Sequence, residues 1–202
     1  TSMVLLTSGS ILVGGSTHEV NGSVDFALVR YNPNGSVDTS FGTSGQVVAS
    51  NSVADDAIAS ISVQTDGKIV AAGKTFIPDL FGGGKWEFEL ARFNSDGSLD
   101  TGFGTGGWVT TDVGNSTDNT GGNALSIQSD GKLVVAGSTN NAFAIVRYNT
   151  NGSLDTSFDT DGIVTTAIGS ASEAKAIAIQ ADGNIVAAGK SDGNFALARY
   201  CP

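Results

Sequence analysis

The chain has 202 residues, 28 of them glycine, with twenty acidic against ten basic side chains and a net charge of −10. A field of this sign repels phosphate backbones, so we expect no nucleic-acid partner. The single cysteine, Cys201, excludes an internal disulfide framework. No apolar run approaches the roughly 18 residues of a membrane helix, so we expect no membrane insertion.

Short β-branched or alternating runs fill the chain, and many are separated by Asp-Gly turns, which is the signature of β-hairpins. No stretch keeps a helical period over enough residues to compete. Taken in order, the runs predict fifteen strands of an all-β protein, at residues 3–7, 11–14, 25–31, 46–50, 57–64, 68–73, 87–93, 108–111, 124–128, 132–137, 143–148, 163–166, 174–180, 184–189 and 195–200.

One segment recurs through the chain and sets its period. It begins at Phe26, passes through an arginine and enters a turn-rich connector at residues 32–45, and it returns three times. The arginines of the protein all occupy this one slot, 52 to 62 positions apart, at Arg30, Arg92, Arg147 and Arg199. Four-stranded units repeated at about 50 residues fit a β-propeller, in which each sheet stacks on copies of itself. A β-solenoid is the alternative, although its rungs are usually much shorter.

We therefore expect one repeat domain over residues 1–202, with about four blades at approximately 1–45, 46–107, 108–161 and 162–202. Fifteen strands are one short of four full blades, so one blade is expected to be incomplete. An incomplete blade leaves an open strand edge, which invites pairing with another chain.

The repeated motifs resemble the bacterial delta-60 repeat. The run from Arg92 to Gly104 and the run from Gln64 to Gly73 carry the resemblance, which extends over almost the whole chain. It implies tandem propeller-like blades and a secreted or cell-surface protein, and it implies no defined activity. The first unit departs from the pattern at residues 7–10, where the Asp-Gly turn has lost its aspartate, and the last copy lacks its connector.

An aspartate follows the repeated arginine by eight positions in three copies. A planar guanidinium can hold a carboxylate or a loop carbonyl with two hydrogen bonds, which lysine cannot imitate. A ligand-binding arginine would be expected in one or two blades, not in every blade. We therefore predict a structural latch that pins each connector to its blade, formed by Arg30, Arg92, Arg147, Arg199, Asp38, Asp100 and Asp155.

The connector also partly matches a calcium-binding loop. Aligned on its glycine, Asn32, Asn34 and Asp38 fill three ligand positions, but the first ligand position falls on Arg30. Asx turns explain the same residues. We expect no metal site and no cofactor, with calcium as the alternative left open.

Two insertions break the repeat in the same hairpin, so both should project from the same face of the propeller. The longer one, a predicted loop at residues 75–87, carries Phe76, Phe81 and Trp86 around three glycines. Exposed aromatic side chains suit sugar stacking or a protein contact, whereas the alternative is a loop that covers its own blade. Together with His18 from the first insertion, they form the predicted ligand- or partner-binding set.

Catalysis finds little support in the sequence. His18 is the single histidine, no cluster of His and Cys exists, and the adjacent carboxylates Asp55 and Asp56 are expected by chance. We predict no catalytic residues and a non-enzymatic, extracellular, bacterial module for structure, assembly or adhesion. Its expected partners are other protein chains or further copies of itself that meet the open blade edge. A carbohydrate-binding propeller that uses residues 75–87 is the alternative, and a glycoside-active enzyme has the least support.

Overall fold

The computed structural model describes residues 1–18, 23–51, 55–81, 83–114 and 120–201. Within these ranges the chain forms fifteen strands and no helix, hence no helix that could span a membrane. The first two antiparallel sheets contain β1 (Ser2–Leu5), β2 (Ile11–His18), β3 (Val24–Tyr31) and β4 (Gln46–Ala49), then β5 (Asp56–Val63), β6 (Ile69–Pro78), β7 (Gly84–Phe93) and β8 (Trp108–Thr111). The third and fourth contain β9 (Gly121–Ile127), β10 (Leu133–Thr139), β11 (Ala142–Tyr148) and β12 (Ile163–Thr166), then β13 (Ser172–Ile179), β14 (Ile185–Ser191) and β15 (Asn194–Tyr200).

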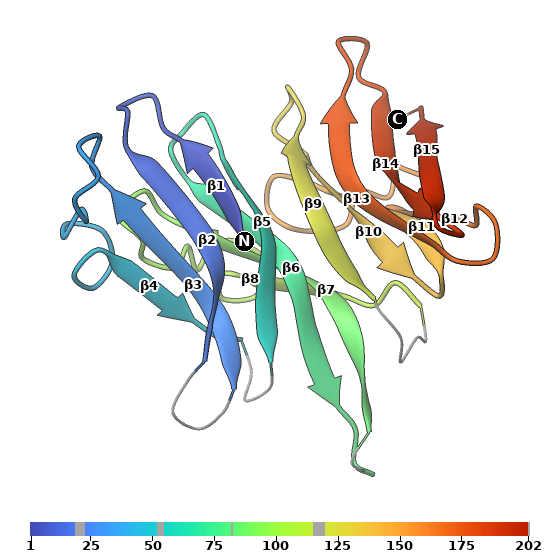
Figure 1. Ribbon diagram of the computed structural model, residues 1–202, viewed down its shortest axis with the longest axis horizontal. Coiled ribbons are helices and arrows are strands. Elements are labelled where there is room, and N and C mark those ends of the chain that lie inside the picture. The colour runs from blue at the N-terminus through green and yellow to red at the C-terminus, as the bar shows by residue number, and fades with distance from the viewer. Residues whose placement is uncertain (19–22, 52–54, 82, 115–119, 202) are drawn as a thin grey trace.

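Each sheet is a meander in which strands pair with their neighbours along the chain. The sheets stand side by side in chain order, from the blue first sheet to the red fourth sheet (Figure 1). This arrangement confirms the predicted all-β propeller fold with one three-stranded blade, and its antiparallel, separate sheets exclude the solenoid alternative. The short strand after each connector pairs with the strand before that connector, as β4 pairs with β3. Each of the first three sheets therefore includes one strand that the expected boundaries assigned to the next unit.

Three apolar cores lie between the four sheets. Alternation along each strand sends large side chains toward the next sheet and many small ones toward the preceding sheet. Between the first two sheets, for example, Phe26 and Leu28 of β3 pack with Ala71 and Ala91. The ring of Phe26 lies 5.4 Å from the ring of Trp108, centroid to centroid. Small residues in the middle of β6 and β7 thus let the sheets approach closely.

The four sheets form an open arc. Among the described strands, the extensive contacts between sheets join neighbours in the sequence, and none of these joins the first sheet to the fourth. In Figure 1 the first and fourth sheets accordingly lie at opposite ends of the molecule. Each end of the arc therefore has one sheet face that no other sheet covers.

A connector turn from each following blade packs on the connector before it. Gly97 has a φ of +91°, and a Cβ there would lie 2.8 Å from Val47 and 3.0 Å from the ring of Phe41. Gly35 holds the same place in the first connector with a φ of +84°, but nothing lies within 4 Å of its Cβ position. Both the positive φ and the close packing favour glycine at position 97, whereas only the positive φ favours it at position 35.

We predict that Gly97→Ala lowers the free energy of unfolding by about 2–4 kcal/mol, because strain at a left-handed backbone adds to overpacking against the preceding connector. Gly35→Ala is the matched control and should cost about 1 kcal/mol, since only the backbone strain remains. Urea unfolding of both variants measures the difference. Equal losses would show that the two connectors do not press on each other.

Candidate functional site

The repeated arginine reaches the repeated aspartate in each connector that the structure describes. The Nε atom lies 2.7–2.8 Å from Oδ2 of the aspartate in the pairs Arg30–Asp38, Arg92–Asp100 and Arg147–Asp155. The same guanidinium lies 4.5–4.6 Å from the centroid of a phenylalanine ring of its connector, in turn Phe41, Phe103 and Phe158. Carboxylate and ring together fix the plane of the guanidinium.

The arginine also crosses to the next blade. Nη1 of Arg30 donates a hydrogen bond of 2.6 Å to the carbonyl oxygen of Ser95, and Nη1 of Arg92 donates one of 2.6 Å to that of Thr150. Both carbonyls belong to the connector of the following sheet. The sequence predicted contacts within one blade, whereas the geometry shows that one side chain holds two successive connectors.

A lysine that the sequence analysis did not single out completes two of these ion pairs. Nζ of Lys68 lies 2.8 Å from Oδ2 of Asp100, and Nζ of Lys132 lies 2.9 Å from Oδ2 of Asp155. The recurrence of Asp-Gly-Lys at residues 66–68 and 130–132 was the available signal. In the first sheet Ser10 takes the place of this lysine, so among the described residues Arg30 is the one cation that pairs with Asp38.

The cations keep these carboxyl groups ionised. The hydrogen bond from Lys68, with further help from Arg92, lowers the pKa of Asp100 against the opposing effect of desolvation. Burial also works against ionisation of Asp155, but hydrogen bonds from Ser157 and Lys132 and the charge of Arg147 hold its pKa well below the usual range.

The fourth arginine of the predicted latch has different partners. The side chain of Arg199 is half exposed, its Nε donates a 2.8 Å hydrogen bond to Oε1 of Gln180, and its Nη2 lies 3.1 Å from Oδ2 of Asp182. Among the described residues it does not have the connector aspartate that its three counterparts have. Arg199 therefore lies on an open face of the fourth sheet, and within the described residues it contacts Gln180 and Asp182 in place of a connector.

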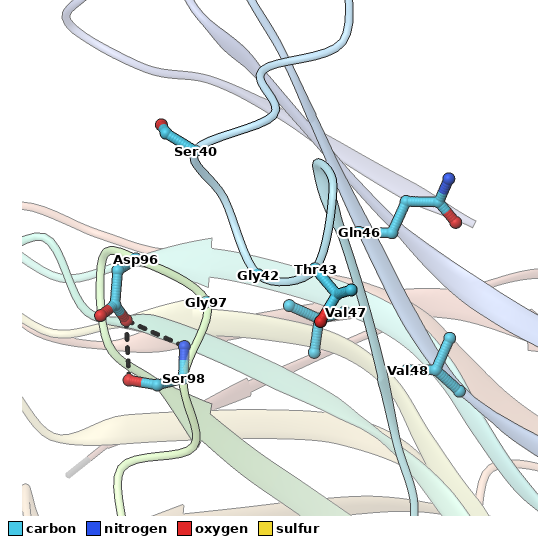
Figure 2. A pocket seen from close by; sticks show the side chains of 9 residues that line it. All are labelled: Ser40, Gly42, Thr43, Gln46, Val47, Val48, Asp96, Gly97 and Ser98. Atoms are coloured by element: carbon cyan, nitrogen blue, oxygen red, sulfur yellow. Dashed lines mark hydrogen bonds between the residues drawn. The ribbon is translucent and has the colours of Figure 1, made fainter.

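The connector oxygens that were aligned with calcium ligands are engaged within their own turns. Oδ1 of Asn34 accepts hydrogen bonds from the backbone and hydroxyl of Ser36 at 3.0 and 2.7 Å. Asp96, which holds the place of Asn34 in the second connector, accepts the same two bonds from Ser98, as Figure 2 shows. Over the described part of the chain, no group of three or more His, Cys, Asp or Glu residues is arranged to hold a metal ion. This arrangement favours Asx turns in the connectors.

The grooves between a sheet and the following connector also repeat. One of about 660 Å³ runs between the segment 40–48 and the turn at 96–98, where Val47 lies beside Gly42 and Thr43 (Figure 2). A groove of about 610 Å³ recurs at the equivalent residues around Trp108 and Gly152. Because both are built from repeat residues, they are part of the blade architecture and do not mark a unique site.

The expected loop at 75–87 is instead a regular hairpin, which corrects that prediction. β6 continues to Pro78 and β7 begins at Gly84, so Phe76 stands opposite Trp86 in the strand register. Their ring centroids are 5.3 Å apart with an edge-on approach, and Nζ of Lys74 lies 4.1 Å from the centroid of Trp86. Cross-strand pairs of this kind stabilise a sheet, so the aromatic side chains extend the hairpin.

The remaining residues of the predicted binding set lie apart from this pair. Phe81 is at the hairpin tip and fully exposed, together with Leu80, which the sequence analysis did not select. His18 is exposed at the end of β2, in the first sheet. The β2–β3 and β6–β7 hairpins extend to the same edge of the molecule (Figure 1). The structure thus brings Phe76 and Trp86 together and leaves Phe81 and His18 separate from them.

The uncovered face of the fourth sheet is apolar. Phe195 and Leu197 are 103% and 66% exposed, whereas the equivalent phenylalanines of the other sheets, Phe26, Phe88 and Phe143, are completely buried. A shallow apolar hollow of about 750 Å³ extends around Phe195 and Leu197. At the other end of the arc, Met3 and Leu5 of β1 are exposed to a similar degree.

One polar cluster breaks the repeat inside the molecule. Asp56 and Glu89 are completely buried in the second sheet. In the third sheet the equivalent places are held by Thr120, just before β9, and by Ala144 of β11. Desolvation, and then the negative charge of Asp56, raise the pKa of Glu89 to about 8. In the sequence, Asp56 is adjacent to Asp55 by chance expectation. The available signal for Glu89 is an acid at a position where the other copies of the repeat have alanine.

Comparison with known families identifies the chain. A family described as a domain of unknown function (DUF5122) beta-propeller matches residues 7–41, 64–103 and 128–158, which together make up half of the sequence. The protein belongs to this β-propeller family. The matched segments contain most of each connector and the Asp-Gly turns at 66–67, 96–97 and 130–131, so the resemblance to a propeller repeat is confirmed at this level. A comparison with curated proteins gives no significant match.

Several solved structures are similar to this chain at low sequence identity. A glucose dehydrogenase is 12% identical with a TM-score of 0.55, and the alignment covers 97% of this chain and 59% of that protein. A thermostable family-43 glycoside hydrolase is 12% identical (TM-score 0.48, coverage 98% and 69%), and virginiamycin B lyase from Staphylococcus aureus is 14% identical (TM-score 0.36, coverage 91% and 69%). The chain thus spans 59% of the length of the dehydrogenase. The likeness to the dehydrogenase shows the fold alone, and these titles assign no activity here.

We predict that Arg92→Lys lowers the free energy of unfolding by about 2–3 kcal/mol, because a lysine cannot hold Asp100 and the carbonyl of Thr150 together. Arg199→Lys is the matched control, since that side chain is half exposed and holds no second connector, and it should change stability by less than about 1 kcal/mol. Melting temperatures of both variants provide the measurement. A melting temperature of Arg92→Lys equal to that of the wild type would refute the latch.

Stability should also depend on pH through the lowered pKa values of Asp100 and Asp155. Because these pKa values are lower in the folded than in the unfolded chain, the stabilisation is fully present above the unfolded value, about 3.9, and is lost as the pH falls below it. Urea unfolding between about pH 6 and pH 2.5 should show this loss, with a shallower decline in Asp155→Asn. An unchanged slope in that variant would show that Asp155 is not the group responsible.

Proposed function

We propose that this protein is a non-enzymatic assembly module, in which the open face of the fourth sheet binds the first sheet of a second copy. The observation that supports this most directly is Phe195, which is fully exposed although its three equivalents are buried against a following sheet. Leu197 is exposed beside it, and a contiguous exposed apolar patch is typical of a protein–protein contact.

The surface that would cover Phe195 can be identified from the equivalent interfaces between neighbouring sheets of the same chain. The side chains that face the next sheet are Phe88, Leu90 and Arg92 in the second sheet, and Phe195, Leu197 and Arg199 in the fourth. The strand register likewise makes Met3 the equivalent of Ile61, which is buried against the first sheet. The two ends of the arc therefore present the two halves of one sheet–sheet interface.

Head-to-tail stacking covers the open face of the fourth sheet in one copy with the first sheet of the next copy. Contacts of this kind close into a ring or continue as a chain of copies, and closed rings of such sheets are typical of β-propellers. Burial of Phe195 and Leu197 contributes about 2 kcal/mol each at every interface. An added connector would also bring Arg199 a carbonyl like those that Arg30 and Arg92 hold.

We further propose that the repeat is of the delta-60 type and that the protein acts outside a bacterial cell, in assembly or adhesion. The motif from Arg92 to Gly104 supports the first statement, and the second comes from that resemblance. Calcium binding by the connectors receives no support from their internal hydrogen bonds.

A second candidate function is glycan binding by the β6–β7 hairpin. The half-buried pair of Phe76 and Trp86 and the exposed Phe81 support it, since all three lie on one projecting hairpin. The contact between Lys74 and Trp86 occupies part of the indole ring, which leaves less of it for a sugar. Assembly through Phe195 has the stronger support because its partner surface is present in the same chain.

We expect light scattering over a range of concentrations to show a monomer that converts to a dimer. The double variant Phe195→Asp/Leu197→Asp should stay monomeric, because two buried carboxylates without partners would oppose stacking. Phe81→Asp is the control, since it removes an equally exposed aromatic from the hairpin tip, and it should still dimerise. A wild-type protein that is monomeric at every concentration, or a dimer that survives the double variant, would refute the proposal.

A further inference from the structure

The interface between the first and second sheets contains two acids without a counter-charge. Asp56 and Glu89 both have 0% exposure. The described lysines are engaged elsewhere, with other acids or with Trp86, and the arginines hold the connectors or Asp182. Removing an ionised carboxylate from water costs several kcal/mol unless a partner compensates it. Two such groups side by side therefore need either a bound cation or a proton to compensate their charge.

Each of the two carboxyl groups has one oxygen held and one oxygen free. Oδ2 of Asp56 accepts hydrogen bonds from the hydroxyl of Ser50 at 3.0 Å and the backbone N–H of Asn51 at 3.1 Å. Oε1 of Glu89 accepts one of 3.2 Å from the side-chain amide of the same Asn51. Oδ1 of Asp56 and Oε2 of Glu89 are buried and have no hydrogen-bond partner.

A third oxygen without a partner lies on the same face of the sheet. Thr75 is completely buried and its Oγ1 has no hydrogen-bond partner. It stands directly opposite Asp56 in the β5–β6 register, while Gly73, two residues before it, stands opposite Glu89. Strand alternation therefore points the side chains of Asp56, Thr75 and Glu89 to one face, toward the first sheet.

The third sheet shows what this position looks like without acids. Thr120 and Thr139 occupy the places of Asp56 and Thr75, and their hydroxyl groups lie 3.2 Å apart and satisfy each other. Side chains at these two positions thus meet across the strands. The second sheet has no such hydrogen bond between Asp56 and Thr75. Asp56 and Glu89 instead bring negative charge and two oxygens without hydrogen-bond partners to this position.

We propose that Asp56, Glu89 and Thr75 form a binding site for one divalent cation, with Ca²⁺ as the ion that fits best. The free atoms are all oxygens, and hard cations such as Ca²⁺ are bound by carboxylate and neutral oxygens, whereas zinc and copper prefer nitrogen and sulfur ligands. Asn51 positions both carboxylates through its two donors. The ion would join the end of the first sheet to the second.

The test uses calcium titration of the chelator-treated protein, followed by calorimetry and by thermal unfolding. The wild type should bind one Ca²⁺, and its melting temperature should rise by about 5 °C at calcium concentrations far above the Kd. Glu89→Ala should abolish both effects. This variant should still fold, because Ala27, Ala144 and Ala196 hold the same slot in the other sheets. Asp56→Thr should behave alike, since Thr120 is its natural counterpart.

Asp159→Asn is the matched control. Asp159 is an exposed acid with a φ of +47°, which asparagine tolerates, so this variant loses the same charge and should bind calcium like the wild type. Binding that persists in Glu89→Ala would overturn the proposal. So would a wild type that shows neither heat nor a change in melting temperature at about 5 mM calcium, because the pair would then be neutralised by a proton.

Discussion

The contact on which the structure depends is one guanidinium that holds two connectors. A four-stranded sheet in this protein cannot bury both of its faces, so its stability comes from the sheets beside it. Apolar packing between sheets is strong but not directional. The arginine adds direction, because its Nε binds the aspartate of its own connector while Nη1 of Arg30 and of Arg92 binds a carbonyl of the next. Register and stacking are therefore fixed by the same side chain.

This constraint explains why the ends of the arc differ from its middle. A repeat in which each sheet needs a neighbour leaves one unsatisfied face at each end. Phe195 and Arg199 are at the positions of Phe88 and Arg92, yet one is exposed and the other holds residues of its own sheet. Each end face thus has the residues of a sheet–sheet interface but no sheet packed against it. These uncovered faces are the physical basis of the proposed assembly.

Much of the fold was readable from the sequence because the repeat enforces it. The strand number, the sheet type and the pairing of arginine with aspartate follow from alternation, Asp-Gly turns and fixed spacing. Three features were not readable. The glycines at 82–84 suggested a loop, but the pair of Phe76 and Trp86 extends the hairpin. The role of Lys68 depends on a turn that meets the connector in space. The proximity of Glu89 to Asp56 could not be predicted, because the two acids lie on different strands and meet only in the folded protein.

The departures from the repeat gather in the second sheet, which has the long hairpin and the buried acids. The arginine contact that couples one sheet to the next recurs along the chain.

Hydrogen exchange of single amides tests most directly whether the arginine couples successive blades. The N–H of Gly104 donates a 2.9 Å hydrogen bond to the carbonyl of Asn151 in the next connector. Leu90 lies in β7 and belongs to the apolar core between the second and third sheets. If the arginine couples the blades, the amides of Gly104 and Leu90 exchange with the same free energy, that of global unfolding. Exchange of Gly104 by local opening, while Leu90 stays protected, would contradict the account.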